Sequence, residues 1–305
     1  MSLIAMPPQT VPGPAGYFDY VTVDAVHRRV YAAHGSTQTL LIVDADTGAV
    51  LKQVKVGPMA GVAVDPSNGH VYIGGSRSDS LSEADPVAGT VLRTVPVAGP
   101  VDAIAFDPVL DRIYGDEDDG TRIFVIDAKT FKEIATIALP GHKPEYIQVD
   151  PVTHEIYQNI SDNDPHVSAI AVIDPHSFTV TRTIPTPDLQ GNHPLQYDAA
   201  HRVLLVAGEN DLLDVYDLAG KRLYQLPYPY RVDQCDYDAS RGWLACAGTG
   251  ITLIGFDGHS VPRILAHLDA ARGLHTCAID PKTGVIFGVW SDAQASYVGR
   301  FVYRP

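Results

Sequence analysis

The chain has little basic charge, few cysteines and no long apolar run, and each absence excludes a class of protein. Its 305 residues include 22 lysines and arginines against 36 aspartates and glutamates, which gives a formal net charge of −14. An acidic surface repels phosphate groups, so we expect neither nucleic acid nor an anionic membrane surface as a partner. No run of residues approaches the roughly 20 apolar positions that a membrane-spanning helix needs.

Cysteine is also scarce, and the chain contains only Cys235, Cys246 and Cys277. No pair has the CxxC spacing, and the odd number leaves at least one thiol free, so cysteine usage does not fix the redox compartment. The localisation stays open between the cytoplasm and a periplasmic or secreted location whose signal is absent from this chain.

The sequence also lacks a helical hydrophobic period, a Ser-His-Asp spacing, a phosphate-binding loop and a nucleotide-binding fingerprint. What it has is an internal repeat of 40 to 48 residues. Each repeat carries an aspartate that ends a short apolar strand and opens a turn: Asp24, Asp65, Asp107, Asp150, Asp198, Asp238 and Asp280. A second strand follows, which contains Tyr31, Tyr72, Tyr114 and Tyr157 in the first four repeats.

A third strand ends at another turn aspartate, as at Asp44 and Asp85, and a fourth strand follows it. Four antiparallel strands in repeats of about 40–45 residues are typical of propeller blades. We therefore predict an all-β fold, a single seven-bladed β-propeller over residues 1–305, and we expect a monomer. The seventh repeat lacks a fourth strand, and we expect the N-terminal segment Ser2–Val11 to supply it and to close the ring.

The repeat resembles the YVTN family of bacterial propellers over essentially the whole chain. The resemblance rests on GVAVDPSNGHVYIGG in the second repeat and AIAFDPVLDRIYGDE in the third, where Asp-Pro, a turn and Val/Ile-Tyr follow one another. The fifth and sixth repeats depart from this pattern, with Leu205 and Ala245 in place of the tyrosine. The resemblance implies the fold and leaves the chemistry open, because the family contains enzymes as well as binding proteins.

Candidate functional residues stand five positions before the repeating aspartate, where each inner strand begins. Six of the seven repeats have a carboxylate or an imidazole there: Asp19, Asp102, Glu145, His193, Asp233 and His275, with Ala60 in the second repeat. Inner strands of a propeller begin at one face of the disc, so we expect these side chains to converge at one mouth of the central channel. Cys235 and Cys277 fall two residues further along in an otherwise apolar column, and we expect both to be buried strand residues.

Converging carboxylates repel one another, and a bound cation relieves that repulsion. We therefore predict a divalent metal ion, Ca²⁺ or Mg²⁺ if carboxylates dominate and Mn, Fe or Zn if the imidazoles take part. The candidate ligands are Asp19, Asp102, Glu145, His193, Asp233 and His275. We expect His275 and Glu145 to act as the catalytic acid–base groups. A solvated polar vestibule without a metal and an organic-ligand site without a metal are the alternatives.

The loops between the second and third strands emerge at the same face and would form the wall of a binding site. Together with the segment before the first inner strand, they provide the candidate substrate-binding residues Tyr17, Tyr20, His34, Glu117, Asn159 and Trp290. The longest of these loops covers residues 159–168, and extra length of this kind is typical of a substrate wall or lid.

Two groups of propeller enzymes hold a metal at this location, and the chain is weakly similar to both. Asp19 is similar to the acidic ligand on the first inner strand of gluconolactonase-like propellers, and His275 to a histidine near the last inner strand of virginiamycin B lyase-like propellers. The chain departs from both, because it has His193 and no Asn in the column, and no E-x-H pattern surrounds His275. The similarity implies a metal-dependent hydrolase or lyase that acts on a small polar, lactone- or ester-like molecule. The alternative is a non-catalytic propeller that binds a protein, peptide or small ligand on the same face.

Overall fold

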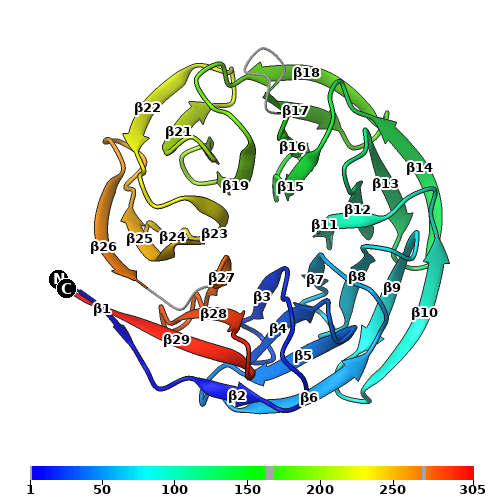
Figure 1. Cartoon of the computed structure of the whole chain (residues 1–305). Helices are drawn as coiled ribbons and strands as arrows, with labels where there is room; N and C mark the ends of the chain where they lie inside the picture. The colour runs from blue at the N-terminus through cyan, green and yellow to red at the C-terminus, as the bar shows by residue number, and fades with distance from the viewer. Residues whose placement is uncertain (1, 163–167, 270–272) are drawn as a thin grey trace.

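Seven antiparallel sheets surround a common axis in the computed structural model, which describes residues 2–162, 168–269 and 273–305 (Figure 1). The described residues form strands and no helix, and the arrangement is a seven-bladed β-propeller, as the sequence predicts. None of the described residues therefore belongs to a helix that could cross a membrane.

Six blades are built from four consecutive strands each. The first blade contains β3 (Val21–Asp24), β4 (Arg29–His34), β5 (Thr39–Asp44) and β6 (Val50–Lys55). The second contains β7 (Val62–Val64), β8 (Val71–Gly75), β9 (Ser80–Asp85) and β10 (Thr90–Pro96). The third contains β11 (Val101–Asp107), β12 (Arg112–Glu117), β13 (Arg122–Asp127) and β14 (Lys132–Ala138). The fourth blade contains β15 (Pro144–Val149), β16 (Ile156–Ile160), β17 (Ala169–Asp174) and β18 (Thr179–Pro185). The fifth contains β19 (Asn192–Asp198), β20 (Val203–Gly208), β21 (Leu212–Asp217) and β22 (Arg222–Pro227). The sixth contains β23 (Val232–Asp238), β24 (Trp243–Gly248), β25 (Gly250–Gly255) and β26 (Arg263–Asp269).

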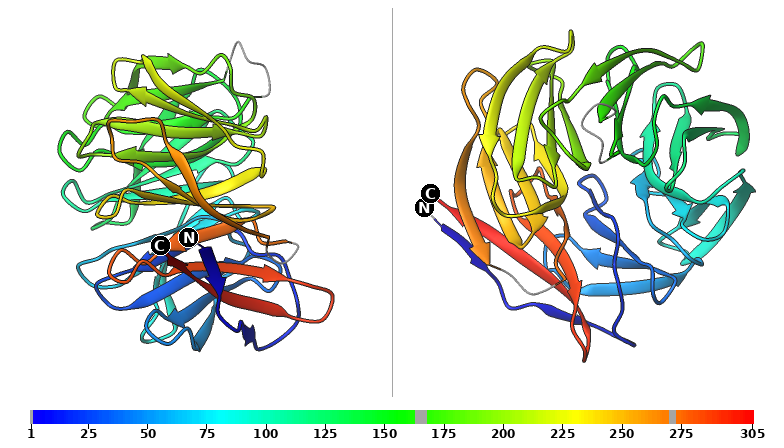
Figure 2. Two further views of the ribbon diagram at one scale, coloured as in Figure 1. Left: turned by 90° about the vertical axis from the view of Figure 1, so that its left-hand side faces the viewer. Right: turned by 45° about the horizontal axis from the view of Figure 1, so that its top comes forward.

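The seventh blade joins the two ends of the chain. It contains β27 (Thr276–Ile279), β28 (Ile286–Ser291) and β29 (Ser296–Arg304), and both β1 (Ser2–Ala5) and β2 (Gln9–Val11) pair with β29. The register places Ser2 opposite Arg304, so the N and C labels lie side by side in both views (Figures 1 and 2). This confirms the prediction that the N-terminal segment closes the ring, and it covers the edge that β29 would otherwise expose.

The repeating aspartates hold both the turns and the blade contacts. Asp150, which is fully buried, accepts a hydrogen bond from the backbone N–H of Val152 through one oxygen and from the Tyr197 hydroxyl of the next blade, at 2.9 Å, through the other. Asp198 does the same with the backbone N–H of Ala200 and the Tyr237 hydroxyl. Each carboxylate thus fixes its own turn and also ties it to the following blade.

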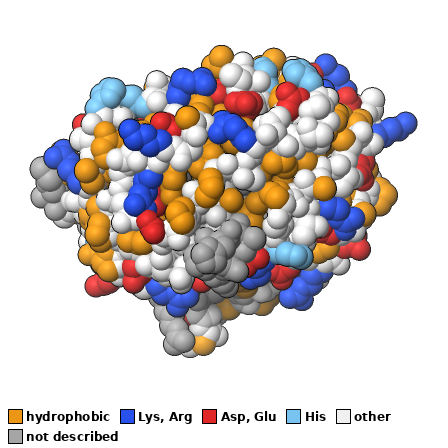
Figure 3. All heavy atoms as spheres, turned by 90° about the horizontal axis from the view of Figure 1, so that it is seen from above, with side chains coloured by type: hydrophobic (Ala, Val, Ile, Leu, Met, Phe, Trp, Pro, Cys, Tyr) orange, Lys and Arg blue, Asp and Glu red, His pale blue; other side chains and the backbone are white. Residues whose placement is uncertain are grey.

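The core lies between neighbouring blades, where the repeated tyrosines pack. Tyr31, Tyr72, Tyr114 and Tyr157 are all buried, and one apolar cluster runs without interruption from the first blade to the fourth. On the outer rim, Figure 3 shows acidic, basic and apolar side chains interspersed, with lysines and arginines scattered rather than gathered.

All three cysteines are buried, as expected for Cys235 and Cys277, and Cys235 takes part in a disulfide. Cys235 and Cys246 stand directly opposite each other on β23 and β24 and form a disulfide. Cys277 on β27 is a free, buried thiol. Strand register brings the first pair together across a single hairpin, and spacing alone does not reveal that register.

Candidate functional site

The structure places the six predicted residues at the start of the inner strands, at one end of the channel. Asp102, Glu145, His193 and Asp233 lie on β11, β15, β19 and β23, while Asp19 and His275 come just before β3 and β27. We call this group, Asp19, Asp102, Glu145, His193, Asp233 and His275, the acidic mouth.

β-bulges at the strand starts orient these side chains. The register between inner and second strands shifts around Asp102 on β11, around His193 on β19 and around Asp233 on β23. On β15 the shift follows Glu145, and the extra residue, Tyr146, has a φ of 57°. A bulge adds an unpaired residue and turns side chains away from the regular pleat, so both Glu145 and Tyr146 reach toward the channel.

An imidazole lies between two carboxylates in the centre of the mouth. The Nε2 atom of His193 is 3.3 Å from Glu145 Oε2 and 3.5 Å from Asp233 Oδ1. Its Nδ1 atom faces Glu209 Oε1 at 3.7 Å. His193 therefore bridges the carboxylates of two blades that are not neighbours in the ring.

His275 is held on both of its ring nitrogens. Its Nδ1 atom lies 2.8 Å from Asp233 Oδ2, and its Nε2 atom lies 3.0 Å from the carbonyl oxygen of Phe18. The Tyr17 ring stacks on the imidazole with ring centroids 5.4 Å apart. Burial by itself lowers the pKa of His275, but the Asp233 carboxylate outweighs it and raises the pKa overall. His275 is thus favoured as an imidazolium that pairs with Asp233.

Burial and mutual repulsion divide the carboxylates of the mouth into two kinds. Burial raises the pKa of Glu145 well above its ordinary value, and the charges of Asp116 and Asp233 raise it further. Burial likewise raises the pKa of Asp102, and that of Asp19 to about 6. Asp233 differs, because the hydrogen bond from His275 and the two nearby imidazoles outweigh burial and lower its pKa. The mouth therefore holds carboxyls that give up a proton less readily than usual beside one that gives it up more readily.

The donor types of the mouth suit a divalent ion, but its atoms do not form a ready coordination site. Within residues 2–162, 168–269 and 273–305, no group of three or more His, Cys, Asp or Glu side chains is arranged to hold a metal. Two ligand atoms bound to the same small ion at about 2.0–2.2 Å lie roughly 3–3.5 Å from each other. The distances from His193 Nε2 to Glu145 Oε2 and to Asp233 Oδ1 match that spacing. A bound ion would therefore require side chains of the mouth to rearrange.

A cavity of about 500 Å³ adjoins the mouth where the N-terminal segment meets the sixth and seventh blades. Tyr17, one of the predicted substrate-binding residues, lines it and is 54% exposed. Asp233 and His275 form its inner side, and Ser291 and Asp292 border it from the seventh blade. The sequence pattern places Ser291 in the seventh of the loops expected to form the wall, but it did not single out Asp292, because this loop is short.

Three predicted wall residues do not face a ligand, which corrects their assignment. The ring of His34, fully buried, stacks on Phe18 with centroids 4.1 Å apart. Asn159 is also fully buried and donates a hydrogen bond to the carbonyl oxygen of His193 at 3.2 Å. Glu117 is buried and pairs with Arg122. All three end or nearly end a second strand, where the pleat turns their side chains between the blades.

Two further predicted residues lie near the mouth without lining the adjoining cavity. Tyr20 is buried inside the channel, and its hydroxyl donates to Asp102 Oδ2 at 3.2 Å. Trp290 stacks on Tyr297 of the neighbouring strand with centroids 5.6 Å apart. Of the predicted long loop, residues 163–167 lie outside the described residues.

A buried polar pair behind the mouth was not among the predicted ligands. Asp116 is fully buried and accepts hydrogen bonds from the backbone N–H of Ala103 at 2.7 Å and from Gln158 Nε2 at 2.8 Å. At the equivalent position, five of the other six repeats have a small or apolar residue, and only Asp116 and Asn159 are polar. This difference between repeats marks Asp116 in the sequence.

Comparisons with known proteins support the fold and stop there. No family model matches the chain, and no curated protein matches it. Among solved structures, a chain of the hydrazine synthase of Kuenenia stuttgartiensis is 15% identical with a TM-score of 0.84, and the match covers 95% of this chain and 97% of that one. A chain of a mitotic checkpoint complex is 12% identical with a TM-score of 0.82, and the match covers 98% of this chain and 92% of that one. At such identities the likeness shows only that the chain is a propeller.

Proposed function

We propose that the acidic mouth is the active site of a hydrolase or lyase that acts on a small polar molecule of the lactone or ester type. One observation carries the proposal: Glu145 and Asp233, whose pKa values shift in opposite directions, approach the same nitrogen of His193. Two titratable groups with pKa values moved apart by their surroundings are the arrangement that supplies an acid and a base at one pH.

The roles follow from the protonation states. In hydrolysis, Asp233 accepts a proton from the water that adds to the carbonyl carbon, and Glu145 donates its proton to the leaving oxygen as the carbon–oxygen bond breaks. In elimination, Asp233 accepts the proton from carbon instead. His193 then returns the proton from Asp233 to Glu145. His275 acts as a positioning residue that keeps Asp233 ionised, which differs from the acid–base role that the sequence predicts for it.

The adjoining cavity supplies room for the substrate. It brings a molecule against Asp233 from the side of Tyr17 and Ser291, and Glu145 lies 3.3 Å from the same His193 nitrogen that Asp233 approaches. The Tyr17 ring is exposed enough to pack on a flat ester or lactone group.

A divalent ion (Mn, Fe, Zn, Mg or Ca) is part of this proposal as a cofactor. In a metal-bound form of the site, Asp19, Glu145, Asp233 and His193 would hold it, with Asp102 beside them. The ion would then polarise the carbonyl oxygen of the substrate in place of the proton transfers through Glu145 and Asp233. Burial raises the pKa values of three of these carboxyls above their ordinary range, because it disfavours their ionised forms. A bound cation would stabilise the ionised forms. Calorimetric titration with Mn²⁺, Zn²⁺ and Ca²⁺ tests this without reference to activity, and we expect Asp19→Asn to weaken binding about tenfold.

The weak similarities to gluconolactonase-like and virginiamycin B lyase-like enzymes support the hydrolase or lyase assignment, whereas the similarity of the repeat to YVTN propellers leaves the chemistry open. The competing proposal is a non-catalytic propeller that binds a ligand on the same face. Turnover separates the two, because a binding protein needs no proton donor.

The test is a screen of lactones and esters for turnover, with and without a chelator. We expect Glu145→Gln and Asp233→Asn each to lower kcat/KM by about 100-fold or more. Each substitution replaces a proton-transfer group by an amide of the same shape. Asp269→Asn serves as the control, because Asp269 is 98% exposed and lies outside the mouth. Full activity in both mouth variants refutes the proposal, and substrate binding without turnover in the native protein favours the non-catalytic alternative.

A further inference from the structure

The opposite end of the channel contains a second cavity that the proposed function does not use. Its volume is about 500 Å³, and residues from the first six blades line it. It reaches the turns that follow the repeating aspartates, where Val26 is 66% exposed, so it opens on the face away from the acidic mouth. We call it the lower cavity.

Two tyrosines separate the lower cavity from the mouth. Tyr20 and Tyr146 both line the cavity, and their rings pack with centroids 5.8 Å apart. The Tyr20 hydroxyl is bonded to Asp102 of the mouth, and the Tyr146 hydroxyl donates to the carbonyl oxygen of Cys235 at 2.9 Å. A ligand in the lower cavity therefore meets side chains that a ligand at the mouth does not.

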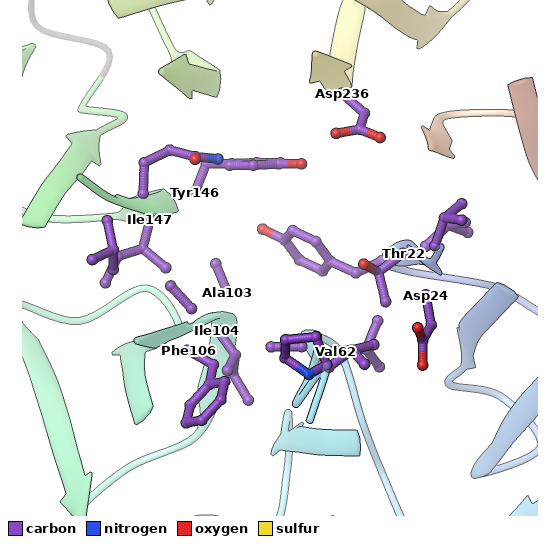
Figure 4. Close-up of a pocket in the computed structure, with 18 of the residues that line it drawn as sticks. Thr22, Asp24, Val62, Ala103, Ile104, Phe106, Tyr146, Ile147 and Asp236 are labelled. Atoms are coloured by element: carbon purple, nitrogen blue, oxygen red, sulfur yellow. The ribbon is translucent and has the colours of Figure 1, made fainter. Parts of the chain in front are cut away.

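The wall of the lower cavity is mostly apolar on the side of the second to fourth blades. Val62, Ala103, Phe106 and Ile147 border the space, and the ring of Tyr146 extends into it (Figure 4). Cavities of about 300–1,000 Å³ with apolar walls and a few polar groups are typical of small-molecule sites.

One carboxylate faces this apolar space without a counter-ion. Asp236 on β23 extends toward the same space in Figure 4 and accepts backbone N–H bonds from Ile279 at 2.7 Å and from Tyr237 at 3.0 Å. The described lining includes no lysine, arginine or histidine. The other carboxylate of the lining, Asp24, is occupied by His27 at 2.8 Å and by its own turn. A half-buried carboxylate without a counter-ion favours a cation beside it.

We infer that the lower cavity binds a small organic cation, a primary amine on a compact apolar body, with its ammonium group on Asp236. An anion is disfavoured by the charge of Asp236, and the apolar wall rewards a hydrocarbon body. A metal ion fits less well, because a single carboxylate supplies too few ligands. The inference does not depend on the proposed function, since the two sites share no ligand-facing residue.

Benzylamine is the probe, and its binding to the full chain is measured by calorimetry or ligand-observed NMR at neutral pH. Benzyl alcohol provides the neutral match and phenylacetate the anionic one. We expect the amine to bind at least about tenfold more tightly than the alcohol, and phenylacetate not to bind. Equal binding of amine and alcohol overturns the inference.

Variants locate the site. Asp236→Asn keeps the size of the side chain and an acceptor for one backbone N–H, and it should weaken benzylamine binding about tenfold or more. Ala105→Leu fills the cavity and leaves Asp236 in place, so it tests the same site if the first variant folds poorly. Asp233→Asn at the mouth is the matched control and should leave binding unchanged. Loss of binding in Asp233→Asn but not in Asp236→Asn places the amine at the mouth and refutes the inference.

Acidification provides an independent readout. Burial raises the pKa of Asp236 to about 6, so its charge, and with it the affinity for benzylamine, should fall as the pH drops through 6. Among the neighbouring titratable groups, the charge of Asp238 adds to the rise in the pKa of Asp236, whereas Tyr146 and Cys277 have raised pKa values and stay protonated in this range. A benzylamine affinity that is constant between neutral pH and well below 6 contradicts the role of Asp236.

Discussion

At the scale of one residue, Asp116 shows how a buried carboxyl at the acidic end of the channel lowers the stability of the folded protein. Its side chain is fully buried, and burial raises its pKa to about 8 even though Gln158 and the backbone of Ala103 donate to it. The folded protein therefore keeps a proton that the unfolded chain releases above its ordinary pKa of about 4. Stability must fall as the pH rises from about 4 to about 8, because the unfolded state binds fewer protons over that window.

Replacing Asp116 by Asn should remove this dependence. We expect the free energy of unfolding of the native protein to fall relative to Asp116→Asn by up to about 1.4 kcal/mol per pH unit between pH 4 and 8. Urea unfolding at several pH values measures the difference, and comparing two variants cancels the contributions of the other acidic groups. Parallel curves for the two proteins would show that Asp116 is ionised in the fold.

The position of a residue was easier to predict than the direction of its side chain. His34, Glu117 and Asn159 stand at strand ends near the predicted mouth, but their side chains turn between blades and pack there. A shift of the strand register by one residue moves a side chain from one face of a sheet to the other. No sequence pattern marks such a shift at a strand end. The column of the acidic mouth was predictable because it recurs in six repeats, so its common orientation did not depend on any single strand.

At the scale of strands, the repeat predicted more of the fold than of the site. The four-strand blades and the pairing of β1 with β29 follow from turn aspartates and from the missing last strand. The bulges that orient Asp102, His193 and Asp233 did not follow, because an extra residue in an inner strand leaves the spacing to the next aspartate almost unchanged. The disulfide between neighbouring strands was hidden for the same reason, since it depends on register.

The N-terminal strand offers a matched pair of substitutions. Leu3 on β1 is 6% exposed and packs into the last blades, whereas Met6 just beyond it is 40% exposed. Leu3→Ala should cost about 2–4 kcal/mol of stability, while Met6→Ala should cost less than about 1. Denaturant unfolding measures both. Equal, small effects would mean that β1 contributes little to closing the ring.

At the scale of the whole molecule, the ring is held by two kinds of contact with different strengths. Within a blade, strands share ladders of backbone hydrogen bonds, whereas the contacts between blades are mainly made by side chains, such as Tyr197 with Asp150 and Arg28 with Asp280. The native closure falls inside the seventh blade, so separating the chain ends requires breaking the strand pairing of β1 with β29. Closure between two blades would rely mainly on side-chain contacts.

Two circular permutants test whether the place of closure matters. In both, Pro305 is joined to Ser2 by an Asn-Gly linker, because Ser2 and Arg304 already face each other as in a hairpin. One permutant opens between Ala219 and Gly220, in the turn before β22, so that the new ends again pair as strands of one blade. The other opens between Ala98 and Gly99, so that the break falls between the second and third blades.

We expect both permutants to fold, because every blade keeps its four strands. The first should lie within about 1 kcal/mol of the native stability, since it restores a closure by strand pairing. The second should be less stable by several times that amount, and its amide exchange should be fastest in β10 and β11, next to the break. If the two permutants prove equally stable, side-chain packing between blades is sufficient to close the ring, and the pairing of β1 with β29 is not what holds the propeller shut.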